Sequence, residues 1–190
     1  MKKAKGQYGY MKSQKLIRTL RTAAFFALVA AVFMIGLFLN KGDRKNIYTV
    51  IAMVGCIPAS MSLVSMIMVW LRRSTDPELY RETTEAAGSM PVCYELFLTT
   101  KDKNLYLDAA AVSDDCIAAF TMDRVSDQDL HFMEEHIRKT LRAQGYKNMT
   151  VKIFNDRGHF LNRIAGMSKA WPGLTERQDK MADVLKAISL

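Results

Sequence analysis

Two long runs without a charged side chain constrain this 190-residue sequence more than any other feature. One covers Thr22–Leu39 and the other Asn46–Leu71, which are 18 and 26 residues. At 1.5 Å of helix per residue, each run is long enough to cross a hydrocarbon core of about 30 Å. The mean hydropathy of −0.04 therefore averages two unlike parts of the chain. We expect two transmembrane helices and one modest domain, which excludes a large multidomain enzyme.

The net charge of +8 is concentrated beside the apolar runs. Residues 1–21 carry seven Lys or Arg and no acid, whereas residues 72–190 carry 17 basic and 18 acidic side chains. A nucleic-acid-binding protein would gather positive charge on its folded domain, so no nucleic-acid partner is expected. The pattern instead suits the anionic surface of a lipid bilayer. The candidate headgroup-binding residues are Lys12, Lys15, Arg18, Arg21, Arg72 and Arg73.

The first apolar run is predicted to be a retained helix and not a cleaved signal peptide. It ends in residues 36–40 without a small-x-small cleavage pattern, and a second apolar run follows within seven residues. The short polar connection at 40–46 predicts an antiparallel helical hairpin. Ten Lys or Arg flank the hairpin on the side of the termini and three lie in the connection. This distribution predicts a protein of the cell membrane with two spans and both termini in the cytoplasm.

Small residues recur at helical spacing in both apolar runs. Such stripes allow close approach of helices in lipid, either within the hairpin or between copies of the chain in a homo-oligomer. No acidic, basic or histidine side chain lies within either span, which argues against ion-coupled transport. The candidate helix-packing residues are Ala27, Ala30, Ala52, Gly55, Ala59 and Ser62.

The remainder of the chain predicts a small α+β cytosolic domain of order α-β-β-β-α-β-α-α with a four-stranded mixed sheet. Helix-capping residues precede four of the expected helices at Asp76, Ser126, Asp156 and Thr175. The expected strands cover 92–100, 105–112, 116–121 and 150–154. The predicted division is a basic cytosolic arm at 1–21, a transmembrane hairpin at 22–71 with helices at 22–39 and 46–71, a linker helix at 72–91, the α+β domain at 92–168 and a C-terminal amphipathic helix at 169–190.

This element order is also the core order of restriction-endonuclease-like folds, whose metal site needs an acid on the second strand and an acid-x-Lys on the third. Asp108 is placed on the second strand, and Glu95 could lie beside it on the first. The third strand has neither acid nor lysine. His131 and His136 are five residues apart and point about 140° apart on a helix, so they do not share a metal. We therefore predict no metal site and no cofactor, with Asp108 and Glu95 as the only weak catalytic candidates.

Three segments resemble an uncharacterised family of small bacterial two-transmembrane-helix proteins. They are residues 8–12, 54–60 and 151–156. Some members are labelled O-linked GlcNAc transferase-like. An enzyme of that kind is expected to contain two nucleotide-binding lobes of at least about 100–150 residues each. The residues that follow the hairpin are too few for two lobes. The resemblance therefore implies an architecture and no activity.

The interpretation that these patterns favour is a membrane-anchored, non-catalytic binding or scaffold domain with an unknown cytosolic protein as its partner. One alternative is an enzyme on a degenerate nuclease fold, and another is a structural membrane oligomer built by the hairpin. A deep polar pocket would favour the enzyme, and a large apolar patch on the cytosolic domain would favour binding.

Overall fold

A computed structural model describes residues 3–39, 47–100, 104–170 and 173–189, which form two compact units. The helical unit is Met11–Arg73, and the α/β unit combines residues 3–10 with residues 74–189. The predicted connection at 40–46, the predicted hairpin turn at 101–103 and the predicted helix break at 171–172 lie outside the described residues.

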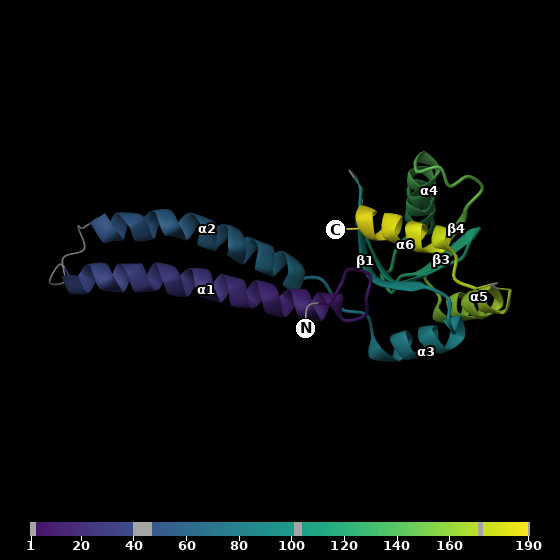
Figure 1. The fold of residues 1–190 in the computed structure, drawn as a ribbon, viewed down its shortest axis with the longest axis horizontal. Coiled ribbons are helices and arrows are strands. Elements are labelled where there is room, and N and C mark those ends of the chain that lie inside the picture. Colours follow the sequence, from purple (N-terminus) through teal and green to yellow (C-terminus); the bar gives the residue numbers. More distant parts are fainter. Residues whose placement is uncertain (1–2, 40–46, 101–103, 171–172, 190) are drawn as a thin grey trace. The chain divides into compact units, whose positions relative to one another are not determined.

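The helical unit contains two helices that lie side by side, α1 (Tyr10–Leu39) and α2 (Ile47–Trp70) (Figure 1). Both are long and apolar enough to cross a membrane. Helix α1 begins at Tyr10, well before the uncharged run, because residues 10–21 contain no Gly or Pro and are rich in good helix formers. The basic arm expected at 1–21 is therefore mostly helical.

The α/β unit is built on a mixed sheet with the strand order β1-β2-β3-β4. The first three strands, β1 (Val92–Thr99), β2 (Asn104–Val112) and β3 (Cys116–Phe120), form an antiparallel meander. Strand β4 (Thr150–Phe154) pairs with β3 in parallel, after a crossover through α4 (Asp127–Ala143). The predicted order of elements and the mixed four-stranded sheet are confirmed.

Helices cover both faces of this sheet (Figure 1). Helices α4 and α6 (Glu176–Ile188) bury their apolar side chains in one core with the sheet, around Leu96, Leu107 and Ile137. Helices α3 (Pro77–Ala87) and α5 (Arg157–Lys169) share the second core, around Phe120 and Phe160. Two buried faces explain why residues 105–112 of β2 are all buried. The predicted caps of α3, α4, α5 and α6 are all present.

The outer edge of β1 is covered by both ends of the chain. The Tyr94 amide donates to the Gly6 carbonyl at 2.8 Å, and Leu98 forms a bridge with Ser189. The Lys5 ammonium donates to the Ser189 carbonyl and so joins the two ends. Covering an edge strand removes a template for pairing with another chain. Residues 3–10 are thus part of the α/β unit.

Candidate functional site

The two acidic candidates, Glu95 in β1 and Asp108 in β2, lie opposite each other. At this point the alternation of side chains between the two faces of the sheet reverses in both strands. The register pairs Tyr94 with Ala109 and Leu96 with Leu107, which places the two acids between these pairs. Side chains two residues apart share one face of a regular strand. Here Tyr94 and Ala109 lie in the core below α3 and α5, whereas Leu96 and Leu107 lie in the core below α4 and α6. Glu95 has a left-handed backbone (φ 57°), which produces the reversal in β1.

Both carboxylates are buried and hold neighbouring segments to the sheet. Glu95 Oε1 accepts hydrogen bonds from the Ser74 hydroxyl and from the Thr75 amide, the latter at 3.2 Å. Asp108 Oδ2 accepts from the Met122 amide at 2.8 Å, and its carbonyl accepts from the Thr75 hydroxyl at 2.9 Å. The acids therefore fix the start of α3 and the end of β3. These bonds use one carboxylate oxygen of each acid, Glu95 Oε1 and Asp108 Oδ2, to hold backbone segments of the fold.

Strand β3 (Cys116–Phe120) adds no carboxylate to this pair, because its sequence is Cys-Ile-Ala-Ala-Phe. In the described ranges, no group of three His, Cys, Asp or Glu side chains is arranged to hold a metal ion. His131 pairs instead with Glu134, with 3.5 Å between Nδ1 and Oε2.

A cavity of about 270 Å³ opens at the carboxyl ends of β3 and β4, which is where open α/β sheets commonly bind ligands. The helix caps Asp76 and Asp156 line it, but their carboxylates already accept from backbone amides of α3 and α5. Arg157 also lines the cavity and is engaged by carboxylates of α3. The full lining is Asp76, Leu79, Phe120, Met122, Asn155, Asp156 and Arg157.

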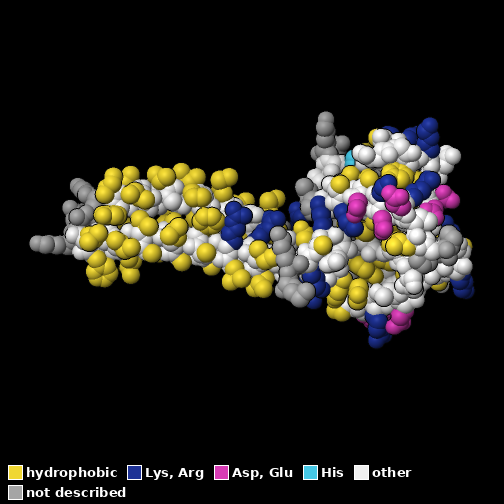
Figure 2. Space-filling view, in the orientation of Figure 1, with side chains coloured by type: hydrophobic (Ala, Val, Ile, Leu, Met, Phe, Trp, Pro, Cys, Tyr) yellow, Lys and Arg dark blue, Asp and Glu magenta, His cyan; other side chains and the backbone are white. Residues whose placement is uncertain are grey.

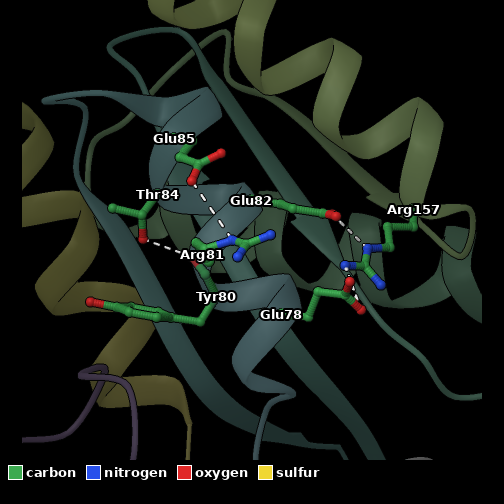
Figure 3. Close-up of polar contacts among 7 residues, drawn as sticks. All are labelled: Glu78, Tyr80, Arg81, Glu82, Thr84, Glu85 and Arg157. Atoms are coloured by element: carbon green, nitrogen blue, oxygen red, sulfur yellow. Dashed lines mark hydrogen bonds and ion pairs between the residues drawn. The ribbon is translucent and has the colours of Figure 1, made fainter.

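Arg157 joins α5 to α3 (Figure 3). Its Nε lies 2.7 Å from Glu82 Oε2 and its Nη2 lies 3.5 Å from Glu78 Oε2. The hydrogen bond to Glu82 raises the pKa of the Arg157 guanidinium further above its ordinary value. The same view shows the neighbouring helical pair of Arg81 and Glu85, 3.7 Å apart. The charge of Arg157 is thus balanced by carboxylates of α3. Arg157 therefore connects α3 and α5, and its charge is not left over to bind an anion in the cavity.

The sequence pattern did not predict that Arg157 and Glu134 hold neighbouring elements of the α/β unit together. Glu134 is 3% exposed and accepts from the Ile153 amide at the open edge of β4. A signal was present, because Glu134 is four residues after Leu130 and three before Ile137 on the apolar face of α4. A carboxylate on such a face indicates a buried acceptor with a specific donor.

The α2 half of the predicted helix-packing stripe lies toward α1. Ala52 and Ala59 are buried, and Gly55 and Ser62 are partly buried. A Cβ at Gly55 would lie 3.1 Å from a methyl carbon of Val29. The backbones can therefore approach closely beside Gly55.

In the α1 half of that stripe, Ala27 and Ala30 are exposed. The α1 residues that are covered include Thr22, Val29 and Gly36. Thr22 Oγ1 lies 3.1 Å from the Ser62 carbonyl and 2.9 Å from its hydroxyl oxygen. Thr22 and Ser62 therefore form a polar pair between the helices, which the spacing of small residues does not predict.

The basic candidates gather toward the end of the hairpin where α1 begins and α2 ends, and Figure 2 shows dark blue side chains there among yellow and white atoms. Trp70 Nε1 donates to Thr19 at 3.0 Å, and Lys15 Nζ lies 5.7 Å from the centre of the Trp70 ring. Lys12 and Arg73 are exposed, and Arg72 is partly exposed. An indole beside cationic side chains is typical of a membrane–water boundary.

Arg18 and Arg21 line a cavity of about 440 Å³ between α1 and α2. Arg18 Nη1 donates to the Ser65 hydroxyl at 2.7 Å and to its carbonyl at 3.2 Å. The Arg21 guanidinium lies 5.6 Å from the centre of the Phe25 ring. We call this cavity the arginine pocket; its lining residues are Gln14, Ile17, Arg18, Arg21, Phe25, Pro58, Met61, Ser62 and Ser65.

No family model, curated protein or solved structure matches this chain. The resemblance to small two-helix membrane proteins therefore stays a prediction, and the functional argument depends on the geometry alone.

Proposed function

We propose that this protein is a two-span membrane protein whose hairpin holds a non-catalytic α+β binding domain at the cytoplasmic face of the membrane. The observation that carries the proposal is where exposed apolar side chains lie. Of the 24 large apolar side chains exposed in the described residues, 21 belong to the helical unit. An aqueous protein does not tolerate a continuous apolar surface of this kind, whereas a lipid bilayer requires one.

The charges beside the spans support the orientation. Ten Lys or Arg flank the hairpin at its two chain ends, against three in the connection. Short segments rich in Lys and Arg are retained in the cytoplasm. The proposal therefore places both termini and the α/β unit on the cytoplasmic side.

The use of the buried acids supports binding over catalysis. Glu95 and Asp108 serve as acceptors for backbone and hydroxyl groups of the fold. The α/β unit also has an open groove of about 400 Å³ between α4 and α6, which offers polar and apolar contacts to a protein partner. Its lining residues are Thr140, Gln144, Tyr146, Lys180, Asp183, Val184, Ala187 and Ile188.

The test combines membrane extraction with cysteine labelling in a variant that lacks the three native cysteines. The protein is expected to stay in the membrane fraction after alkaline carbonate washing. An impermeant maleimide added to intact cells is expected to label Gly42→Cys and to spare Asn104→Cys. Release by carbonate, or labelling at position 104 in intact cells, would contradict the proposal.

Crosslinking in cells then tests the binding role. A photoreactive side chain at Lys180, in the α4–α6 groove, is expected to capture one reproducible cytosolic protein. The same probe at Lys139, exposed on α4, is the control.

A further inference from the structure

The arginine pocket lies at the depth of the lipid headgroups of one leaflet. Arg18 lies opposite Ser65 and Thr22 opposite Ser62. A hydrocarbon core of about 30 Å takes about 20 helical residues, and 20 residues counted back from Leu39 reach Leu20. Arg18 and Arg21 therefore flank the boundary between hydrocarbon and headgroups, while the facing segment of α2, which contains Ser62 and Ser65, is uncharged.

The charge in this pocket is unbalanced by the chain itself. Residues 1–42 and 44–75 contain no Asp or Glu, so no acid lies in either helix. A guanidinium has five N–H donors, and the bonds from Arg18 to Ser65 are both made by Nη1. Arg18 is half-buried and Arg21 is exposed. Two neighbouring arginines favour an anion with several acceptor oxygens, such as a phosphodiester.

A shallow apolar groove on the surface of α1 continues from the pocket. It has a volume of about 250 Å³, is lined by Arg21, Ala24, Phe25 and Leu28, and shares Arg21 and Phe25 with the arginine pocket. Leu28 is seven residues beyond Arg21, about 10 Å deeper along α1. An inorganic anion gains nothing from this groove, whereas an acyl chain gains dispersion contacts by lying against its side chains.

We propose that the hairpin binds one anionic glycerophospholipid of the leaflet on the side of the chain termini. Its phosphate bonds to Arg18 and Arg21, and one acyl chain lies along Ala24, Phe25 and Leu28. The inference rests on the proposed membrane insertion. It deepens that proposal by naming a lipid class and a site, where the sequence alone indicated only general attraction to headgroups.

The test measures lipid retention by native mass spectrometry of the full chain in detergent, with equimolar phosphatidylglycerol and phosphatidylcholine. The wild type is expected to retain one phosphatidylglycerol in preference to phosphatidylcholine. Arg18→Gln combined with Arg21→Gln is expected to weaken that retention on the order of tenfold. The matched control, Lys139→Gln with Lys147→Gln, removes equal charge from exposed positions of the α/β unit and is expected to stay within about twofold.

Two further measurements separate a lipid from a free anion. Ala24→Trp fills the apolar groove on α1 without changing charge and is expected to reduce phosphatidylglycerol retention. Inorganic phosphate at millimolar concentration is expected not to displace the lipid. Circular dichroism of each variant checks that its helices are intact.

The inference is overturned if the arginine and lysine pairs lose retention equally, or if phosphate displaces the lipid and Ala24→Trp has no effect. The proposed function fails separately, because carbonate extraction reports membrane insertion independently of lipid retention. A chain that stays in the membrane while Arg18→Gln with Arg21→Gln retains the lipid would refute only the lipid site.

Discussion

Replacing Glu134 by alanine tests how the open edge of β4 is held. The Glu134 side chain is 4% exposed, and its Oε1 accepts from the Ile153 amide at 2.9 Å. The same oxygen lies 3.1 Å from Lys152 Nζ. Alanine removes this acceptor, so the buried Ile153 amide loses its hydrogen bond to Glu134. Glutamine keeps an acceptor oxygen and removes only the charge.

The structure sets the expected magnitudes. A buried donor left without its acceptor costs about 1–3 kcal/mol, so Glu134→Ala should lower the free energy of unfolding by about 2 kcal/mol. For a unit of this size, that loss corresponds to roughly 6–8 °C in Tm. Glu134→Gln should cost about 1 kcal/mol, because the amide bond is retained. Glu135→Ala is the matched control, since Glu135 is the next residue on α4, is 49% exposed and pairs with Lys139. It should cost about 0.5 kcal/mol.

Thermal unfolding of the full chain in detergent, followed by near-ultraviolet circular dichroism, measures these differences. Hydrogen exchange detected by mass spectrometry adds a local readout, because peptides covering Thr150–Phe154 should exchange faster in Glu134→Ala. Equal Tm losses in the Glu134 and Glu135 alanine variants, or unchanged exchange in β4, would refute the assigned edge contact.

Four further outcomes are expected. Gly55→Leu should lower the stability of the helical unit by about 1–3 kcal/mol through overpacking, whereas the adjacent, exposed Val54→Leu should have little effect in the same detergent melt. Arg157→Ala should cost about 1 kcal/mol at low salt and less at 1 M NaCl, measured by urea unfolding. Burial raises the pKa of the Cys93 thiol from 9.0 to about 11. The stability contributed by the protonated thiol is therefore complete below pH 9 and is lost as pH rises to 11. Cys93→Ala should accordingly lose less Tm than the wild type between pH 8.5 and pH 11. Purified protein with Mg²⁺ or Mn²⁺ should leave DNA and RNA intact on gels, and cleavage abolished by Asp108→Ala would instead support the nuclease alternative.

Much of the α/β unit is predictable because its signals are local. Asp76 followed by proline starts α3 at Pro77, and Ser126 starts α4 at Asp127. Gly145 has a φ of 91° at the end of α4, where an L side chain is strained. Each of these signals acts within one helical turn, so the sequence around it carries the information.

Contacts between distant segments were not predictable in the same way. The bond from the Tyr94 amide to the Gly6 carbonyl joins residues 88 positions apart, and it uses only backbone atoms on the Gly6 side. No side-chain pattern marks it. The contact between Thr22 and Ser62 is a similar case, because it joins residues 40 positions apart and the spacing of small residues does not mark it.

Strand β1 forms where the sequence predicts it, but at Glu95 its side chains switch from one face of the sheet to the other. Alternation over Tyr94, Leu96 and Leu98 predicts one shared face, but Tyr94 belongs to the opposite core. A left-handed residue costs roughly 1–2 kcal/mol, and the sheet permits the change of face because both faces are buried under apolar helices. The hydrogen bonds that Glu95 accepts from Ser74 and Thr75 offset that cost. Glu95, the candidate catalytic partner of Asp108, therefore holds the chain that enters α3. A Glu95→Gly variant relieves the backbone strain but removes the acceptor, so it should be less stable than the wild type in thermal unfolding. A more stable variant would show that the backbone strain outweighs the hydrogen bonds.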